Sequence, residues 1–265
     1  MMKEALHSSI ISFTKDLEKY SEKAGVKFDA DIIHELRTTF KKFRALLRWQ
    51  KIDKEVYAAF KKIYDTAGRL RNIQVAKEML KKEKNIPYAF KAWLTITLLQ
   101  LKEEWDEVYD KKIPMQLRED VSNLQITPTK HKKFFSKKIQ TILNILSITP
   151  VSDDSIHDIR KMVKDMQYVL EWWKDKKGGS KTLLRNISIK QLKTIGTLIG
   201  EYNDKRTLLN LLISYSQQEK DPALINEISP VIYKWQHYKV LQKEKLLIKL
   251  KIFAARLNSM SREIT

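Results

Sequence analysis

The segment from Ile32 to Trp49 carries an apolar stripe with the spacing of an α-helix. Its members recur every three or four positions, at Ile33, Leu36, Phe40, Phe43 and Leu47. This spacing places them on one face of a helix, so the segment predicts an amphipathic helix with a buried side. Glycine and proline each occur only six times in 265 residues. With so few breaks between long helical patterns, the sequence favours an all-α fold.

A second row of side chains on the same segment is basic. This first basic row consists of His34, Arg37, Lys41, Arg44 and Arg48. It lies about 100° from the apolar stripe, so its side chains flank the buried face. At a rise of 1.5 Å per residue the row is about 20 Å long, which suits an extended anion better than a single phosphate. Only Glu35 supplies negative charge within residues 34–48, so acids of the same segment do not balance the row.

The same pattern returns 123 positions later. Ile-His-Asp-Ile-Arg at 156–160 aligns with Ile-His-Glu-Leu-Arg at 33–37, and the apolar stripe matches as far as Trp49 and Trp172. The expected helix N-caps also agree, since Asp29 corresponds to Ser152. One short motif would be weak support, but agreement over three turns indicates an internal duplication.

The second basic row is shorter than the first. It contains His157, Arg160 and Lys164, while Gln167 and Glu171 stand where later positive charges would fall. We therefore expect the first half to contribute more to any anion site.

The helix after each basic row also repeats. Gly68 aligns with Gly200, and Asn72 aligns with Asp204. Because a glycine inside a helix costs about 1 kcal/mol relative to alanine, its recurrence calls for a reason such as close helix contact or a local bend.

Prolines, glycines and capping residues predict the limits of the helices. We expect two four-helix bundles with pseudo-twofold symmetry, over residues 1–122 and 123–265. The first bundle would have a helix ending at Gly25, one capped by Asp29, one over 53–82 and one from Pro87 that fades before Pro114. The second would have helices after Pro128 and Ser152, a loop at 177–180, a helix over 188–217 and a last helix starting at Ser229-Pro230.

The charge of the chain predicts a polyanionic partner. With 51 Lys and Arg against 32 Asp and Glu, the formal net charge is +19. Nucleic acid, an anionic membrane surface and inorganic polyphosphate are the candidates. The absence of cysteine excludes disulfides and thiolate zinc sites. No signal peptide or transmembrane span is recognisable, so we expect a soluble cytoplasmic protein without membrane association.

Motifs for catalysis and metal binding are incomplete. Thr38 stands where the second histidine of a zinc-protease helix belongs, which leaves only a symmetric site with one histidine from each half. Gly178-Gly179-Ser180-Lys181-Thr182 resembles a phosphate-binding loop but lacks the glycine before the lysine and a preceding strand. We therefore expect a non-catalytic protein with no metal and no cofactor.

The two histidine helices, together with Gly68-Arg69-Leu70-Arg71-Asn72 and the segment Leu198 to Asp204, resemble the CHAD family, the "conserved histidine α-helical domain". In the first half the family commonly has Arg-Asp where this chain has Arg71-Asn72. The resemblance implies a pair of four-helix bundles whose basic central surface binds inorganic polyphosphate, and some family members gather on polyphosphate granules. By the motif match the candidate ligands are His34, Arg37, Lys41, Arg44, His157, Arg160 and Lys164. Arg71 lies in the glycine-bearing helix, and charge and spacing add Arg48, Lys133, Lys137, Lys190 and Lys193.

We therefore predict non-catalytic polyphosphate binding along a surface built from both halves, with a location at polyphosphate granules as a further expectation. Two alternatives remain. The charge would also suit a nucleic-acid-binding protein, although the first basic row lacks exposed aromatic residues for base stacking. The chain could equally be a regulatory subunit that associates with a polyphosphate- or triphosphate-metabolising enzyme.

Overall fold

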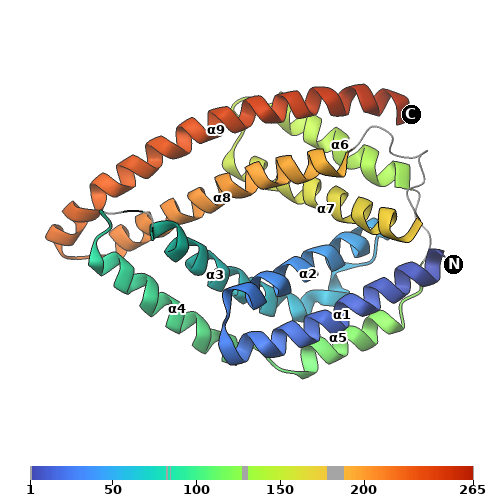
Figure 1. Cartoon of the computed structure of the whole chain (residues 1–265), viewed down its shortest axis with the longest axis horizontal. Coiled ribbons are helices and arrows are strands. Elements are labelled where there is room, and N and C mark those ends of the chain that lie inside the picture. The colour runs from blue at the N-terminus through green and yellow to red at the C-terminus, as the bar shows by residue number, and fades with distance from the viewer. Residues whose placement is uncertain (1, 82, 84, 127–130, 178–187, 265) are drawn as a thin grey trace.

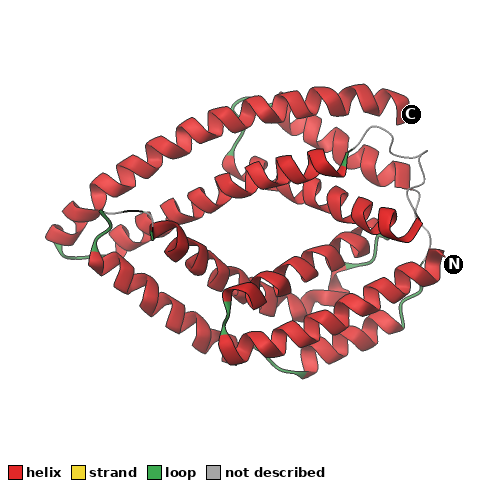
Figure 2. Ribbon diagram, in the orientation of Figure 1, coloured by secondary structure: helices red, strands yellow, loops and turns green. Residues whose placement is uncertain are grey.

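The computed structural model describes residues 2–81, 83, 85–126, 131–177 and 188–264. Over these residues the chain is helical and contains no strand, which confirms the all-α prediction (Figure 2). The helices are α1 (Met2–Lys27), α2 (Ala30–Trp49), the 3-10 helix η1 (Lys54–Tyr57), α3 (Ala58–Leu80), α4 (Tyr88–Val108), α5 (Lys112–Ser122), α6 (His131–Ser147), α7 (Asp153–Lys177), α8 (Ile189–Gln218) and α9 (Pro222–Ile264).

Four helices form an inner ring, and the others pack outside it. Helices α2 and α7 come together at one end of the ring, while α3 and α8 meet at the opposite end (Figure 1). Outside the ring, α1, α4 and α5 cover the side of α2 and α3, and α6 and α9 cover the side of α7 and α8. The two basic rows thus lie on helices that face each other across the ring.

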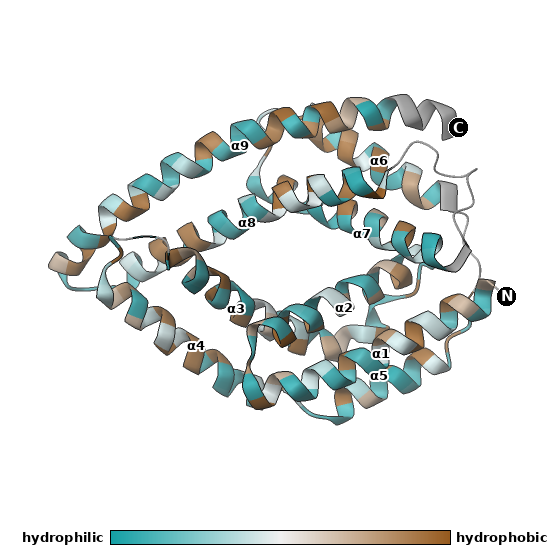
Figure 3. Ribbon diagram, viewed as in Figure 1, coloured by the Kyte–Doolittle hydropathy of each residue, from teal (hydrophilic) through white to brown (hydrophobic). Residues whose placement is uncertain are grey.

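Aromatic contacts close the ring where α2 and α7 converge. The ring centroid of Trp49 lies 5.5 Å from that of Trp172 and 5.8 Å from that of Trp173. The predicted apolar stripe of α2 is confirmed, because all five of its side chains are fully buried. Apolar and polar residues are interspersed along the helices, as expected for helices with one buried face (Figure 3). None of the described helices has an apolar stretch long enough to cross a bilayer.

Both predicted caps of the basic helices are confirmed. The Asp29 carboxylate accepts hydrogen bonds from the backbone amides of Asp31 and Ile32, at 2.8 and 3.2 Å. The Ser152 hydroxyl accepts one from the Ser155 amide at 3.0 Å. The prediction that Gly25 ends the first helix is wrong, since α1 continues to Lys27 and the left-handed residue is Phe28, with φ of 48°. Gly25 instead lies against the indole of Trp105, where a Cβ atom would be only 3.0 Å from the ring nitrogen.

The first half contains five described α-helices, so the prediction of four is wrong. The additional helix is α5, which contains Pro114 in its first turn. Amides of the first turn have no partner within a helix, so a proline is tolerated there and does not mark an interruption.

The last helix begins earlier than predicted. It starts at Pro222, where the Asp221 carboxylate caps the Ala223 amide at 2.9 Å, and it continues through Pro230. The proline removes one backbone hydrogen bond. Ile228, Val231 and Trp235 on either side are nonetheless buried, so packing holds the segment helical.

Candidate anion-binding pocket

A pocket of about 500 Å³ lies between the four inner helices. It brings together five cationic side chains, two histidines and two carboxylates. Its lining residues are His34, Arg37, Lys41, Arg71, Asn72, Val75, Asp154, His157, Arg160, Asn203, Asp204, Arg206, Thr207 and Asn210. We call this the central pocket. Six residues predicted as ligands therefore come together in one place, three from α2, one from α3 and two from α7.

Arg37 is held against α3 by stacking and by hydrogen bonding. Its guanidinium lies 4.8 Å from the centroid of the Tyr64 ring, and Nη1 donates to the Tyr64 carbonyl oxygen at 3.3 Å. The same guanidinium occupies the space that a Cβ atom on Gly68 would need. Of the two reasons expected for Gly68, close helix contact is therefore the one observed. The absence of a side chain at Gly68 leaves room for the Arg37 guanidinium.

Arg160 occupies the equivalent place on α7. A Cβ atom on Gly200 of α8 would lie 3.3 Å from Nη2 of Arg160. The Nε atom of Arg160 is buried and has no hydrogen-bond partner among the described residues. One turn earlier on α8, Gly196 lies against the aliphatic end of Lys164, 3.0 Å from Cε to the position of a Cβ atom. Both basic rows are thus seated against glycines of the neighbouring helix.

Lys41 lies half-buried among other cations. Burial, together with the nearby charges of Arg37 and Arg160, lowers the pKa of its ammonium group to about 7. Desolvation also lowers the pKa of His34 and of His157, each of which has an arginine nearby. The pocket therefore holds more positive charge than its own carboxylates balance.

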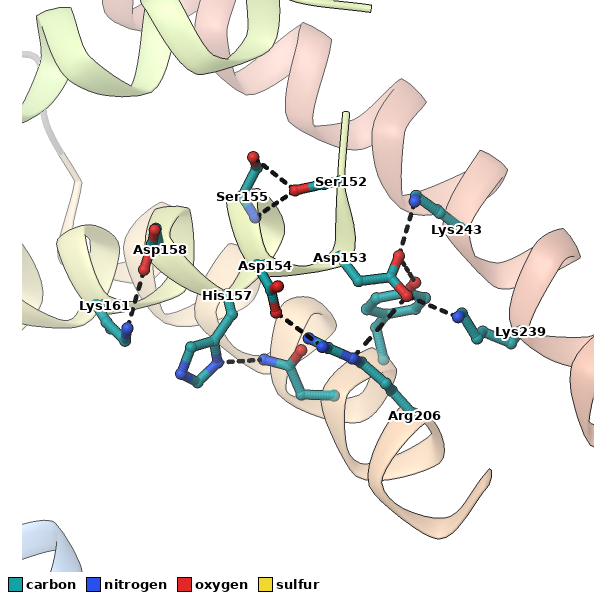
Figure 4. Close-up of polar contacts among 12 residues, drawn as sticks. Ser152, Asp153, Asp154, Ser155, His157, Asp158, Lys161, Arg206, Lys239 and Lys243 are labelled. Atoms are coloured by element: carbon teal, nitrogen blue, oxygen red, sulfur yellow. Dashed lines mark hydrogen bonds and ion pairs between the residues drawn. The ribbon is translucent and has the colours of Figure 1, made fainter. Parts of the chain in front are cut away.

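The two carboxylates of the pocket lie on the side of α7 and α8. Asp154 accepts a hydrogen bond from Nη2 of Arg206 at 2.7 Å (Figure 4). The Asn203 side chain contacts Nδ1 of His157 at 3.4 Å. Partial desolvation raises the pKa of Asp204, against the opposing charges of Arg160, Arg71 and Lys41.

Asp153, next to the pocket, joins three helices. Its carboxylate pairs with Lys239 at 2.6 Å and with Lys243 at 2.7 Å, both from α9, and accepts a hydrogen bond from the Tyr202 hydroxyl at 2.7 Å (Figure 4). Burial alone would raise the pKa of Asp153, but these hydrogen bonds hold it well below its ordinary range. The network fixes the N-terminus of α7, and with it Asp154, relative to α8 and α9.

Comparison with known proteins assigns the family. The sequence model of the CHAD domain matches residues 12–212. The chain belongs to the CHAD family. That family is associated with polyphosphate binding in general. The crystal structure of the CHAD domain from the plant Ricinus communis aligns with 97% of this chain and 91% of its own, with a TM-score of 0.65 and 15% identity, and so shares the fold. No curated protein matches the sequence.

The remaining predicted ligands of this CHAD domain lie outside the central pocket. Arg44 stacks over Phe40, Tyr57 and Tyr64, with its guanidinium 5.4 to 5.7 Å from the ring centroids. Lys164 donates to the Gln167 side chain at 3.0 Å. Arg48, Lys133 and Lys137 line a different pocket, Lys193 pairs with Glu171 at 2.9 Å, and Lys190 is exposed at the start of α8.

The convergence of α2 with α7 explains why the first basic row is divided. Near Trp49 and Trp172 the two helices are in contact, so the space that receives Arg37 and Lys41 closes before Arg48 is reached. Arg48 instead reaches Asp165 of α7, at 3.1 Å. The first basic row is continuous along α2, but its two ends therefore line two separate pockets.

Several pocket residues of this CHAD domain were not predicted. Arg206, Asn203 and Asn210 of α8 all line the pocket. Their spacing of three and four residues marks one polar face of the helix but does not indicate which neighbouring helix that face meets. Among the described residues no group of three or more histidines or acidic residues could hold a metal ion. The loop at 177–180 and the phosphate-loop-like segment at 178–182 fall largely or wholly outside the described residues.

Proposed function

We propose that this CHAD domain binds inorganic polyphosphate in the central pocket. The observation that carries the proposal is the convergence of five cationic side chains from four helices with only two carboxylates. Arginine presents a planar pair of donors to phosphate oxygens, and lysine a mobile point charge. A polyphosphate chain would contact Arg37, Lys41 and Arg71 on one side and Arg160 and Arg206 on the other.

The chemistry of the lining favours polyphosphate over nucleic acid. The described residues that line the central pocket include no phenylalanine, tyrosine or tryptophan, and Val75 is their single apolar side chain. Recognition of single-stranded nucleic acid generally uses aromatic rings on which bases stack. A ligand made only of phosphate units leaves no base to accommodate.

We further propose that the pocket arose from an internal duplication, with one pseudo-twofold-related half on each side. The support is the repeated pairing of an arginine with a glycine, Arg37 with Gly68 and Arg160 with Gly200. The proposed halves are residues 1–122 and 123–265.

The proposed role is binding without catalysis, in the cytoplasm and at polyphosphate granules, where the domain could accompany a phosphate-metabolising enzyme. The donors of the pocket provide retention of a polyanion. Release of phosphate from long-chain polyphosphate by the purified protein, with or without Mg²⁺, would contradict the non-catalytic role.

Competition tests the choice of ligand. Labelled long-chain polyphosphate is bound to the protein, and unlabelled polyphosphate, single-stranded DNA, double-stranded DNA or RNA is added at equal phosphate concentration. We expect only polyphosphate to displace the label efficiently, and we expect the affinity to fall steeply with salt as counterions are released. Equal or better displacement by any nucleic acid would overturn the assignment.

A further inference from the structure

A second pocket, of about 430 Å³, lies outside the ring between α2, α6 and α7. It combines five cationic side chains with an apolar floor. Its lining residues are Arg48, Trp49, Lys51, Lys133, Phe134, Lys137, Lys138, Thr141 and Met162. The described residues that line the second pocket include no carboxylate, and none of them lines the central pocket.

A buried carboxylate links the three helices that form the second pocket. Asp165 of α7 is only 5% exposed and accepts two hydrogen bonds from Nη1 of Arg48, both at 3.1 Å. It also accepts one from Nζ of Lys138 at 2.8 Å. Because Arg48 belongs to α2 and Lys138 to α6, this single carboxylate joins all three helices that form the pocket.

The other three cations have no such counter-charge. Lys51, Lys133 and Lys137 are exposed and form no ion pair with a residue that the structure describes. They surround the pocket with positive charge that is available to a ligand. The second pocket therefore favours an anionic ligand.

The floor of the second pocket favours a ligand that has an apolar part as well as negative charge. Phe134 and Met162 are partly exposed in it, above the buried Trp49. Nζ of Lys138 lies 4.8 Å from the centroid of the Phe134 ring, which places a cation beside an aromatic surface. Bare polyphosphate has no apolar part to cover these side chains, whereas a ring attached to phosphate would cover them.

We propose that the second pocket binds a nucleotide, with its phosphates at Lys133, Lys137 and Lys51 and its base against Phe134 and Met162. The volume falls in the range of small-molecule sites, and such sites combine apolar walls with a few polar groups that fix orientation. This site is separate from the proposed polyphosphate pocket and does not depend on it.

The equivalent place in the other half lacks this chemistry. At the offset of 123 residues, Glu171, Trp172 and Lys174 correspond to Arg48, Trp49 and Lys51, and all three line a third pocket of about 330 Å³. There Glu171 and Asp175 add negative charge, and Lys193 is paired with Glu171 at 2.9 Å. Of these two corresponding pockets, the second pocket is therefore the one suited to an anionic ligand.

Calorimetric titration of the Arg37→Ala, Arg160→Ala variant, in which the central pocket is weakened, with ATP and with inorganic tripolyphosphate tests the proposal. The two ligands share a chain of three phosphates and differ in the nucleoside. We expect ATP to bind about fivefold more tightly or better, since stacking of a base on an aromatic ring is worth about 1–3 kcal/mol. Phe134→Leu keeps the apolar character but removes the ring, and should abolish most of the difference. Equal binding of ATP and tripolyphosphate by the Arg37→Ala, Arg160→Ala variant would overturn the proposal.

Paired variants locate the site. Lys133→Ala with Lys137→Ala removes two exposed charges and should weaken ATP binding about tenfold or more, while long-chain polyphosphate binding changes by less than about threefold. The matched control is Lys245→Ala with Lys249→Ala, which removes two exposed charges from α9. If ATP binding survives the loss of Lys133 and Lys137 but is lost with Arg37 and Arg160, ATP occupies the central pocket and the inference is wrong. The polyphosphate proposal would then still stand, because its own test uses long-chain polyphosphate.

Discussion

The two walls of the central pocket share the equivalent arginines Arg37 and Arg160, but the second arginine of each wall, Arg71 or Arg206, has a different partner. On the α2 and α3 wall, Arg37 and Arg71 donate to the backbone carbonyls of Tyr64 and Ala30, each at 3.3 Å. On the α7 and α8 wall, Arg206 is bonded to the Asp154 carboxylate. A neutral carbonyl orients a guanidinium and leaves its charge in place, whereas a carboxylate also cancels that charge.

This difference indicates that the first wall provides most of the attraction for an anion. The α7 and α8 wall has the same arginine and glycine arrangement, but a ligand that uses Arg206 must compete with Asp154. Five experiments can break or sharpen this comparison.

Removal of the two glycine-seated arginines should have the largest effect. Charge-assisted hydrogen bonds contribute about 1.5–3 kcal/mol each, so Arg37→Ala with Arg160→Ala should weaken polyphosphate binding about 100-fold or more. In the single variants we expect a greater loss for Arg37 than for Arg160. Affinities measured at fixed salt, against Lys245→Ala with Lys249→Ala as the charge-matched control, check this. Equal losses in the test and control pairs would mean that only total charge matters.

Rising pH should weaken polyphosphate binding through Lys41. Its pKa of about 7 in the free protein means that above pH 7 binding of a polyanion is accompanied by proton uptake, so affinity should fall by up to about tenfold per pH unit. Titrations between pH 6 and 9 check the slope. Lys41→Arg should flatten it, whereas Lys42→Arg at the next position should not. An unchanged slope in Lys41→Arg would exclude Lys41 as its source.

The same shift has the opposite effect on the stability of the ligand-free protein. Lys41 has a lower pKa when folded than the usual value of about 10.4, so the unfolded chain binds more protons between pH 7 and 10. The free energy of unfolding contributed by this group therefore rises with pH over that interval. Thermal denaturation without polyphosphate should show this rise, and saturating polyphosphate should abolish it, because Lys41 is then protonated in the folded complex as it is in the unfolded chain.

Substitution of Gly68 and Gly200 should show how much each wall contributes to polyphosphate affinity. In Gly68→Ala the new Cβ atom would displace the Arg37 guanidinium, so we expect about a fivefold loss of affinity, a fraction of what a charge-assisted hydrogen bond contributes. In Gly200→Ala the contact with Arg160 is 3.3 Å, and we expect less than about a twofold loss. Helicity should be retained in both, since alanine favours a helix by about 1 kcal/mol over glycine. A greater loss for Gly200→Ala would reverse the proposed ranking of the walls.

Removal of the counter-charge on the weaker wall should produce a small gain. Asp154→Asn leaves Arg206 with its longer contact to Asp153, at 3.9 Å, and should raise polyphosphate affinity about two- to threefold, as expected for loss of a partly exposed ion pair of under about 1 kcal/mol. Asp31→Asn is the matched control, because Asp31 is the equivalent acid 123 residues earlier and does not line the pocket. Equal gains in both variants would show a general charge effect with no specific role for Asp154.

The local features of the ring helices were predictable from the sequence because these helices are strongly patterned, whereas their arrangement in a ring was not predicted. The apolar stripe of α2, the caps at Asp29 and Ser152, and the repeated histidine, arginine and glycine positions could all be predicted from spacing alone. Helix ends were less predictable, because Pro114 and Pro230 lie within helices that packing maintains.

The distribution of charge between sites could not be predicted from the sequence. Arg48 belongs to the first basic row by spacing, but the convergence of α2 with α7 brings it to Asp165. Arg206 was missed because its place in the pocket depends on how α8 packs against α7. Both outcomes depend on helix crossing, which a periodic pattern does not specify.

The seating of Arg37 and Arg160 against glycines has a consequence for the entropy of binding. A long side chain that becomes immobilised only when a ligand arrives loses about 0.5–1.5 kcal/mol of conformational freedom at that moment. Here the order is imposed during folding, by Gly68 and Gly200 and by the Tyr64 ring. The flexibility lost on association then belongs mainly to the ligand, so each further phosphate unit that the pocket restrains adds to the entropic penalty.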